Sequence, residues 1–341
     1  MSETDSVAPE HHPEDSRHDN ETLPAVRTVA ALREAVESRD CRKLESLLGT
    51  LSAEDRDACI TARHSHMSVL HRVAHLNYPD IAGLLLENVT DKDEYIAAMD
   101  VVGDTALHTA AFSGNFEMAD FLVKNVTAKN EYVTTKSKGQ GKTALHFAAK
   151  LDSPHIAALL IKNATDKDGY INTPDHNHLT ALHIAIDNNR LEIATLLVNN
   201  VKDKDTCFTA HDSRRDPALH LAVHRDAADI VHLLINNVTE KTRVLNAANY
   251  YQQTPLHIAA FCNAVNVIFP LLENGSDARL RDSHGLTAWD VAVRRKSWEF
   301  ISAVILAEER WLIKPNLPVI YIHDNDVRIF ILRSYHRTPR R

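Results

Sequence analysis

The amino-acid sequence predicts an all-α protein built from stacked helix pairs, and three repeated features support this prediction. A tetrapeptide that mostly ends in Leu-His recurs at spacings of 37, 38, 37, 37, 37 and 33 residues. Seven positions after the tetrapeptide Leu stands Gly, Asn or Asp, the residues that best tolerate a left-handed backbone and so end a helix. An aliphatic pair closes each period. Self-similarity at a fixed spacing of this size indicates a repeat array rather than one globular core.

Each repeat has the same internal order. The tetrapeptide occupies residues 68–71, 105–108, 143–146, 180–183, 217–220, 254–257 and 287–290. The expected turn residues are Asn77, Gly114, Asp152, Asn189, Asp226 and Asn263. The aliphatic pairs are Leu85-Leu86, Leu122-Val123, Leu160-Ile161, Leu197-Val198, Leu234-Ile235 and Leu271-Leu272. We therefore expect every unit to form a helix, a tight turn, a second helix and a loop.

The Thr-Pro/Ala-Leu-His opening, the helix pair and the Leu-Leu ending resemble the ankyrin repeat over about residues 28–306. This resemblance implies an all-α ankyrin-repeat solenoid of stacked helix-turn-helix units. It also implies that the tetrapeptide Thr and His form hydrogen bonds within and between repeats, while the Leu fills the core. One such unit cannot bury its apolar face alone, so the two ends of the array need polar caps.

The domain organisation follows from the position of the repeats. We expect a capping unit over residues 28–49 and repeats starting near residues 66, 103, 141, 178, 215, 252 and 285, the last of them a C-terminal cap. Residues 1–27 should form a disordered arm, because residues 1–23 hold seven acids and one Arg. Residues 307–341 should form an extension with a basic end, in which residues 319–332 could form a hairpin packed on the last repeat.

Two features depart from a regular 33-residue repeat. About four extra residues follow most second helices and predict extended inter-repeat loops. Asn-x-Thr recurs there at Asn88, Asn125, Asn163 and Asn237, but without a secretory signal we do not expect glycosylation. Pro270 falls inside the sixth second helix and predicts that this helix is kinked or shortened.

No motif for catalysis or cofactor binding can be read in the sequence. Glycine accounts for only 9 of 341 residues and forms no phosphate loop. The pairs His71/His75 and His220/His224 have the spacing of a zinc-binding helix but lack a third ligand, so we expect no metal and no cofactor. The four cysteines are scattered, as is typical of reduced thiols. We therefore do not expect an enzyme or a small-molecule substrate.

Charge and hydropathy limit the choice of partners. The net charge of −8 is concentrated at the N-terminus, and the middle of the chain is only mildly acidic, so we expect no direct nucleic-acid binding. No apolar run approaches the roughly 18 residues of a membrane span. A cytoplasmic, possibly nuclear, location follows by default. The expected partners are one or more proteins.

The candidate partner-binding residues stand four and five positions after the tetrapeptide His, together with residues at the loop tips. The resemblance implies that the units curve and that first helices and loop tips line the concave face, where partners bind. The residues are His75, Phe112, Ser113, Lys150, Leu151, Asp187, Asn188, His224, Arg225 and Phe261, with Tyr250 and Tyr251 at a loop tip. The equivalent positions of the last unit are Arg294 and Arg295, and other loop tips carry Val101, Val102, His176, Arg214 and Arg215. The residue types at these positions vary from repeat to repeat, as expected of a surface that recognises a partner. Random sequence drift on a surface without a function would give the same variation. Phe112 and Phe261 are the strongest candidates, because exposed aromatic residues favour interfaces.

Two functions remain open. Residues 245–259 and 275–287, and the long spacing, resemble the inhibitory ankyrin proteins of the NF-κB system, the IκB type. The Asp-Ser-Gly phosphodegron of that group is missing, because Asp5-Ser6-Val7 and Asp15-Ser16-Arg17 lack the Gly, and the tail is basic rather than acidic. The sequence thus predicts a protein-interaction adaptor, with an IκB-like inhibitor of a Rel-type transcription factor as the alternative.

Overall fold

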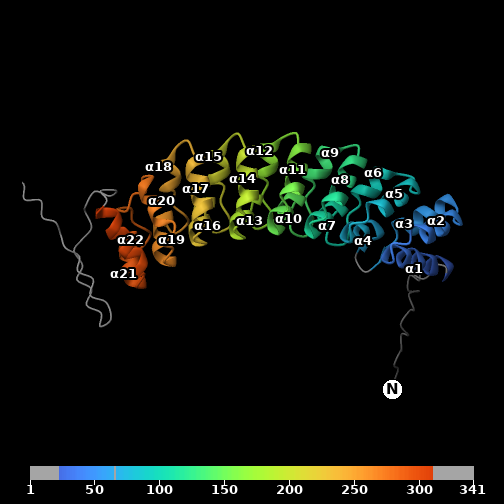
Figure 1. Ribbon diagram of the computed structural model, residues 1–341, viewed down its shortest axis with the longest axis horizontal. Helices are drawn as coiled ribbons and strands as arrows, with labels where there is room; N and C mark the ends of the chain where they lie inside the picture. Colours follow the sequence, from blue (N-terminus) through green and yellow to red (C-terminus); the bar gives the residue numbers. More distant parts are fainter. Residues whose placement is uncertain (1–22, 65–66, 310–341) are drawn as a thin grey trace, which may run out of the picture. The chain divides into compact units, whose positions relative to one another are not determined.

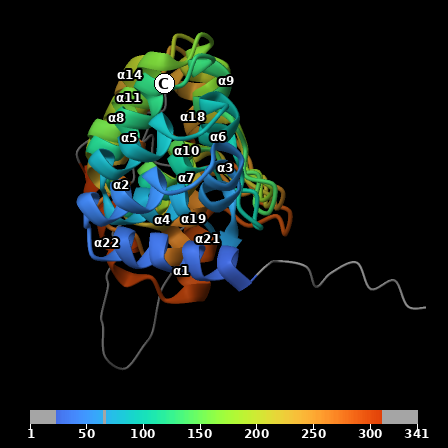
Figure 2. The ribbon, with the colours of Figure 1, turned by 90° about the vertical axis from the view of Figure 1, so that its right-hand side faces the viewer.

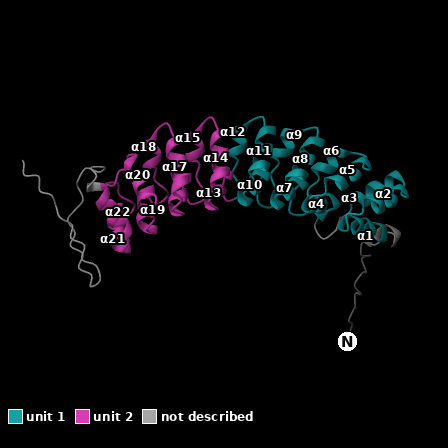
Figure 3. Ribbon diagram, in the orientation of Figure 1, with its two compact units in different colours: residues 1–176 teal, residues 177–341 magenta. Residues whose placement is uncertain are grey.

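The structure is a computed structural model that describes residues 23–64 and 67–309. The chain divides into two compact units, residues 1–176 and 177–341 (Figure 3). Almost all of the described secondary structure is helical (Figure 1), which confirms the all-α repeat fold. The predictions of a disordered arm up to residue 22 and of a hairpin within residues 319–332 lie outside the described residues.

Unit 1 contains a terminal group of helices and three complete repeats. The terminal group consists of α1 (Leu23–Glu37), α2 (Cys41–Gly49) and α3 (Ala53–Thr61), followed by the antiparallel strands β1 (Arg63–His64) and β2 (Met67–Ser68). The repeats comprise α4 (Val69–Leu76), α5 (Pro79–Glu87), α6 (Lys92–Ala97), α7 (Ala106–Ser113), α8 (Phe116–Asn125), α9 (Lys129–Thr134), α10 (Ala144–Leu151), α11 (Pro154–Asn163) and α12 (Lys167–Ile171). Helix α1 begins at Leu23, so the last residues of the expected arm are helical instead. Pro24 is compatible with this start, because its fixed φ suits the first helical turn.

Unit 2 continues the same order of helices. They are α13 (Ala181–Asp187), α14 (Leu191–Asn200), α15 (Lys204–Thr209), α16 (Ala218–His224), α17 (Ala228–Asn237), α18 (Lys241–Leu245), α19 (Pro255–Cys262), α20 (Ile268–Glu273), α21 (Ala288–Arg295) and α22 (Trp298–Glu309). Helix α22 extends a few residues beyond the expected end of the array at 306. None of the helices described in either unit has the length and apolar character needed to cross a bilayer.

Each unit has three rows of helices. In unit 1, the first helices α4, α7 and α10 pack on one another, and so do the second helices α5, α8 and α11. The short helices α6 and α9 contact the second-helix row, and Figure 2 shows them on a third side. The core lies between the rows and is filled by side chains such as Leu107, Leu145 and Met118, which are fully buried.

The tetrapeptide forms the predicted network of hydrogen bonds. Thr105 caps α7, its backbone N–H donates to His108 Nδ1 over 3.1 Å, and Thr143 and His146 do the same for α10. The other ring nitrogen of the tetrapeptide His meets a backbone carbonyl ahead of the next first helix. These contacts are His71 to Asp104 O, His108 to Lys142 O, His183 to Ala210 O, His220 to Gln253 O and His257 to Leu286 O. Because a carbonyl can only accept, Nε2 carries the proton in each of these rings.

The predicted turn residues adopt the left-handed backbone. All of the non-glycine members have positive φ, from 51° at Asp226 to 59° at Asn77, and Gly114 has a φ of 72°. Lys296 takes the same role after α21. The amphipathic pattern and the choice of Gly, Asn or Asp together specify where each first helix ends.

The expected inter-repeat loops each contain a short third helix, which is a correction to the sequence prediction. In these helices two adjacent side chains are buried, for example Tyr95 and Ile96 in α6 and Cys207 and Phe208 in α15. The extra residues therefore extend the core, because each short helix covers the end of the second-helix row with apolar side chains.

The Asn-x-Thr segments have a structural role at the junction of the repeats. The Asn88, Asn125, Asn163 and Asn237 side chains each donate to the carbonyl four residues earlier, at the end of a second helix. The following Thr is hydrogen-bonded to a side chain of the preceding short helix. These partners are Asp57 for Thr90, Asp93 for Thr127, Asn130 for Thr165 and Asp205 for Thr239.

Pro270 shortens its helix as expected. Helix α20 spans 6 residues, whereas α8, α11, α14 and α17 span 10. Because α20 begins at Ile268, Pro270 lies in its first turn, where a missing N–H removes no hydrogen bond of the helix.

Candidate protein-binding surface

The candidate residues on first helices lie in the last turn of those helices or at their C-cap. In unit 1 these are His75 on α4, Phe112 and Ser113 on α7, and Lys150 and Leu151 on α10. All are exposed except Ser113, which is half-buried. Their position follows from helix geometry, because the residues one turn earlier face the core and the chain then turns away. We refer to this side of each unit as the first-helix face.

Neighbouring repeats position these side chains. His75 Nδ1 and Ser113 Oγ lie 2.9 Å apart in a hydrogen bond between α4 and α7. Phe112 is 51% exposed, and its ring meets that of buried Phe147 edge-on, with 5.8 Å between centroids. Aromatic pairs at this separation are attractive. Phe112 is therefore held in place while half of its surface remains available.

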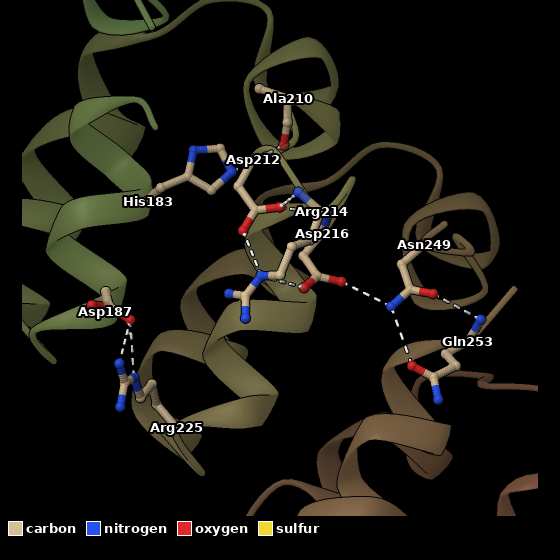
Figure 4. A network of polar contacts seen from close by, with 9 residues as sticks. All are labelled: His183, Asp187, Ala210, Asp212, Arg214, Asp216, Arg225, Asn249 and Gln253. Atoms are coloured by element: carbon tan, nitrogen blue, oxygen red, sulfur yellow. Dashed lines mark hydrogen bonds and ion pairs between the residues drawn. The ribbon is translucent and has the colours of Figure 1, made fainter. Parts of the chain in front are cut away.

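In unit 2 the first-helix face begins with an ion pair. Both Nε and Nη2 of Arg225, the C-cap residue of α16, donate to Asp187 Oδ1 on α13, over 3.0 and 2.5 Å (Figure 4). Because both side chains are 45% exposed to solvent, the pair contributes at most about 1 kcal/mol to stability. The exposed Asn188 donates its amide to Ile184 O, and His224 is exposed beside Arg225.

A cation–π contact marks the other end of this face. Phe261 on α19 is 45% exposed, and the Arg295 guanidinium on α21 lies 4.1 Å from the centre of its ring. Phe112 and Phe261 thus occupy the same position in two different repeats, and each contacts a side chain of the following repeat.

The loop tips are built on a buried acid or amide that sequence reasoning missed. Asp212 Oδ1 accepts from the backbone N–H groups of Arg214 and Asp216, and Asn249 Oδ1 does the same for Tyr251 and Gln253. The sequence signal was present, because Asp100, Asp175, Asp212, Asn249 and Asp282 all stand five residues before the tetrapeptide.

Successive loop tips are also linked to each other. Asn249 Nδ2 donates to Asp216 Oδ1 over 2.9 Å, and Arg214 lies between Asp212 and Asp216 (Figure 4). Asn249 therefore fixes the tip that carries Tyr250 and Tyr251 to the preceding loop tip. Both tyrosines are exposed, and their rings meet edge-on with 5.3 Å between centroids. Val101 and Val102 are exposed at the equivalent tip in unit 1.

The tetrapeptide histidines serve the core rather than this surface. Burial lowers the pKa of His108 to about 4, and it also lowers the pKa values of His220 and His257. His71 and His220 each have Nε2 hydrogen-bonded to a carbonyl of the next repeat, so this nitrogen is not available to the i,i+4 pairs. Within the described ranges, no three His, Cys, Asp or Glu side chains gather in a group that could hold a metal ion.

Comparisons with known proteins agree with this architecture. The family model for ankyrin repeats, in three copies, matches residues 32–134, 127–207 and 202–282, and the chain belongs to the ankyrin-repeat family. No curated protein matches the sequence. Among solved structures, the chain is similar to the ankyrin repeat domain of Bcl-3, which is described as a unique member of the IκB protein family. The TM-score is 0.56 and the sequence identity 22%, over 70% of this chain and 100% of that one.

These findings define the class of protein. Ankyrin repeats form protein-interaction modules, and this chain has repeats with a row of exposed, variable side chains on the first-helix face of each unit. The similarity to the Bcl-3 domain is a similarity of fold.

Proposed function

We propose that the protein is an adaptor that binds partner proteins through the first-helix face and the neighbouring loop tips. One observation carries the proposal. Phe112 and Phe261 each leave about half of a large apolar side chain in water, at the same position in separate repeats. Folding gains nothing from the exposed half, whereas aromatic side chains held in place are typical anchors of protein interfaces.

The remaining candidate residues would set specificity. Their side chains differ in size and charge from repeat to repeat, whereas the buried residues beside them are of the same types in each repeat. They are His75, Ser113, Lys150 and Leu151 in unit 1, and Asp187, Asn188, His224 and Arg225 in unit 2. Tyr250 and Tyr251 would add a second aromatic contact at a loop tip. Polar side chains around apolar anchors are the usual composition of an interface rim.

The test is an affinity pull-down of the full chain from cell lysate with mass-spectrometric identification. The variant Phe112→Ala/Phe261→Ala should lose the partner proteins that the wild type recovers. The control Phe116→Ala/Leu306→Ala removes side chains that are 38% and 50% exposed on second helices, one in each unit, and should retain those partners. Both variants should melt close to the wild type. If the two variants recovered the same proteins, the first-helix face would not be the binding surface.

A second function is favoured by the similarity to Bcl-3. We propose as the alternative that the protein is an IκB-like inhibitor that sequesters a Rel-type transcription factor, since the fold of its repeats is similar to that of an IκB-family domain. Both functions would be carried out in the cytoplasm or nucleus. Recovery of a Rel-homology protein by the wild type, and its loss with Phe112→Ala/Phe261→Ala, would favour the inhibitor. Recovery of other proteins alone would favour the adaptor.

A further inference from the structure

The first-helix face of unit 2 carries positive charges, two of which no ion pair among the described side chains of that unit neutralises. Helix α21 ends with Arg294 and Arg295, both exposed, at the positions equivalent to the candidate residues of the other repeats. No ion pair joins either arginine to an acid among the side chains described in residues 177–307. By contrast, Arg225 on the same face is already paired with Asp187.

The nearby carboxylates are engaged elsewhere. Asp226 accepts from the backbone and side chain of Asn266, and Glu299 accepts from the side chain of Asn263. Asp290 accepts from Thr287 at the start of α21. The contacts of Asp226 and Glu299 join neighbouring repeats, and that of Asp290 caps α21. These acids are therefore used for structure, and none of them pairs with the two arginines at the end of α21.

Arg295 is also oriented by its neighbour. The central carbon of its guanidinium lies 4.1 Å from the centre of the Phe261 ring, so the ring holds the cation in a cation–π contact. Holding a guanidinium in this way reduces the entropy that is lost when its edge binds a carboxylate. The C-terminal dipole of α21 accounts for cations in its last turn, but it does not account for a half-exposed phenyl ring beneath one of them.

We propose that Phe261, Arg294 and Arg295 form a binding surface for an acidic peptide segment of the partner. A carboxylate of that segment would accept hydrogen bonds from the Arg295 edge, and a neighbouring apolar side chain would pack on the exposed part of Phe261. Arg294 supplies a second positive charge for an adjacent acid. This inference rests on the proposed function, since it assigns a partner chemistry to one part of the first-helix face.

The direct test uses a fluorescein-labelled synthetic peptide that alternates glutamate with leucine, and its counterpart with glutamine in place of glutamate. The wild-type chain should bind the glutamate peptide more tightly, and rising salt should weaken that binding, since the charges are solvent-exposed. The charge reversal Arg294→Glu/Arg295→Glu should weaken binding by about tenfold or more. Arg295→Lys keeps the charge but loses the planar guanidinium and its fork of N–H groups, so we expect a smaller loss.

A matched control separates a local site from overall charge. Lys241→Glu/Arg243→Glu makes the same change in net charge on α18, whose residues do not belong to the first-helix face, and should leave binding within about twofold. Equal binding of the two peptides, or equal losses in the two charge-reversed variants, would overturn the proposal. A synthetic peptide of residues 1–22 should bind more weakly than the glutamate–leucine peptide. If it bound more tightly and lost binding with Arg294→Glu/Arg295→Glu, the occupant would be the chain's own acidic arm and the partner assignment would be wrong.

The same proteins distinguish failure of this inference from failure of the proposed function. If lysate partners are lost with Phe112→Ala/Phe261→Ala but retained with Arg294→Glu/Arg295→Glu, the first-helix face binds partners and the acidic-segment assignment is wrong. If neither variant changes the recovered proteins, the proposed function fails as well.

Discussion

Acidification should destabilise the repeats through the buried histidines, and His108 allows the effect to be worked out. Its Nδ1 accepts a hydrogen bond from the Thr105 backbone N–H, and its Nε2 donates to Lys142 O over 3.1 Å. A second proton would have to sit on Nδ1, opposite an N–H group that is already pointing at it. Burial is the main cause, because it disfavours the charged ring, and it lowers the pKa of His108 to about 4.

The sign and size of the effect follow from the difference in proton binding. In the unfolded chain the His108 pKa is near its ordinary value of 6.5, so between pH 6.5 and about 4 the unfolded state binds a proton that the folded state does not. The stability contributed by neutral His108 is therefore present above about pH 6.5 and falls as the pH is lowered. At about 1.36 kcal/mol per pH unit, protonation of His108 in the unfolded chain lowers the free energy of unfolding by about 2 kcal/mol between about pH 6.5 and about pH 5.

Urea unfolding at a series of pH values measures this effect. Asp104 works in the opposite direction, because burial and neighbouring Asp100 raise its pKa to about 6 and so favour folding at lower pH. Comparison of the wild type with His108→Asn cancels that background. The variant is less stable at neutral pH, but its loss of stability between about pH 7.5 and about pH 5 should be smaller by about 2 kcal/mol. Parallel pH profiles for the two proteins would refute the reasoning.

Two further predictions test the repeat architecture. Leu145 is fully buried between the helix rows, so Leu145→Asp should bury an unpaired charge and remove more than about 4 kcal/mol of stability; circular dichroism and a thermal melt that stayed unchanged would show that the repeat register is wrong. Gly114 has a φ of +72°, and the only atom near an added Cβ would be Ser153 Oγ, at 3.6 Å. Gly114→Ala should therefore lower the free energy of unfolding by about 1 kcal/mol through backbone strain alone. Gly83 lies inside α5, and an added Cβ would meet only the Phe121 ring at 3.9 Å, an ordinary van der Waals contact. Gly83→Ala should therefore stabilise the protein by about 0.5–1 kcal/mol, and equal signs in the two melts would contradict this assignment.

The order of helices and turns within each repeat could be predicted from sequence, because each helix start and end depends on residues close to it in the chain. Thr105 and His108 lie within one helical turn, and Gly114 ends the helix by its own backbone freedom. Such signals need no knowledge of the rest of the chain. The position of Phe112 on an exposed last turn follows from the same counting of residues along the helix.

Other features depended on contacts between repeats and were not predicted. The short helices such as α6 and α15 are too brief for a periodic pattern, and their apolar pairs become buried only through contact with other helices. The stack of Arg295 on Phe261 joins residues in different repeats, and neither residue alone indicates it. The asparagine and aspartate residues beneath the loop tips recur at a fixed offset, so that signal could have been found.

The central claim is that the first-helix face contacts the partner, and site-specific photo-crosslinking tests it most directly. A photoreactive phenylalanine analogue placed at position 112 or 261 of the full chain, and at positions 116 or 306 as controls, would be irradiated in cell lysate. We expect covalent partner adducts from positions 112 and 261 and none from the two second-helix positions. Adducts from 116 or 306 with none from 112 and 261 would contradict it.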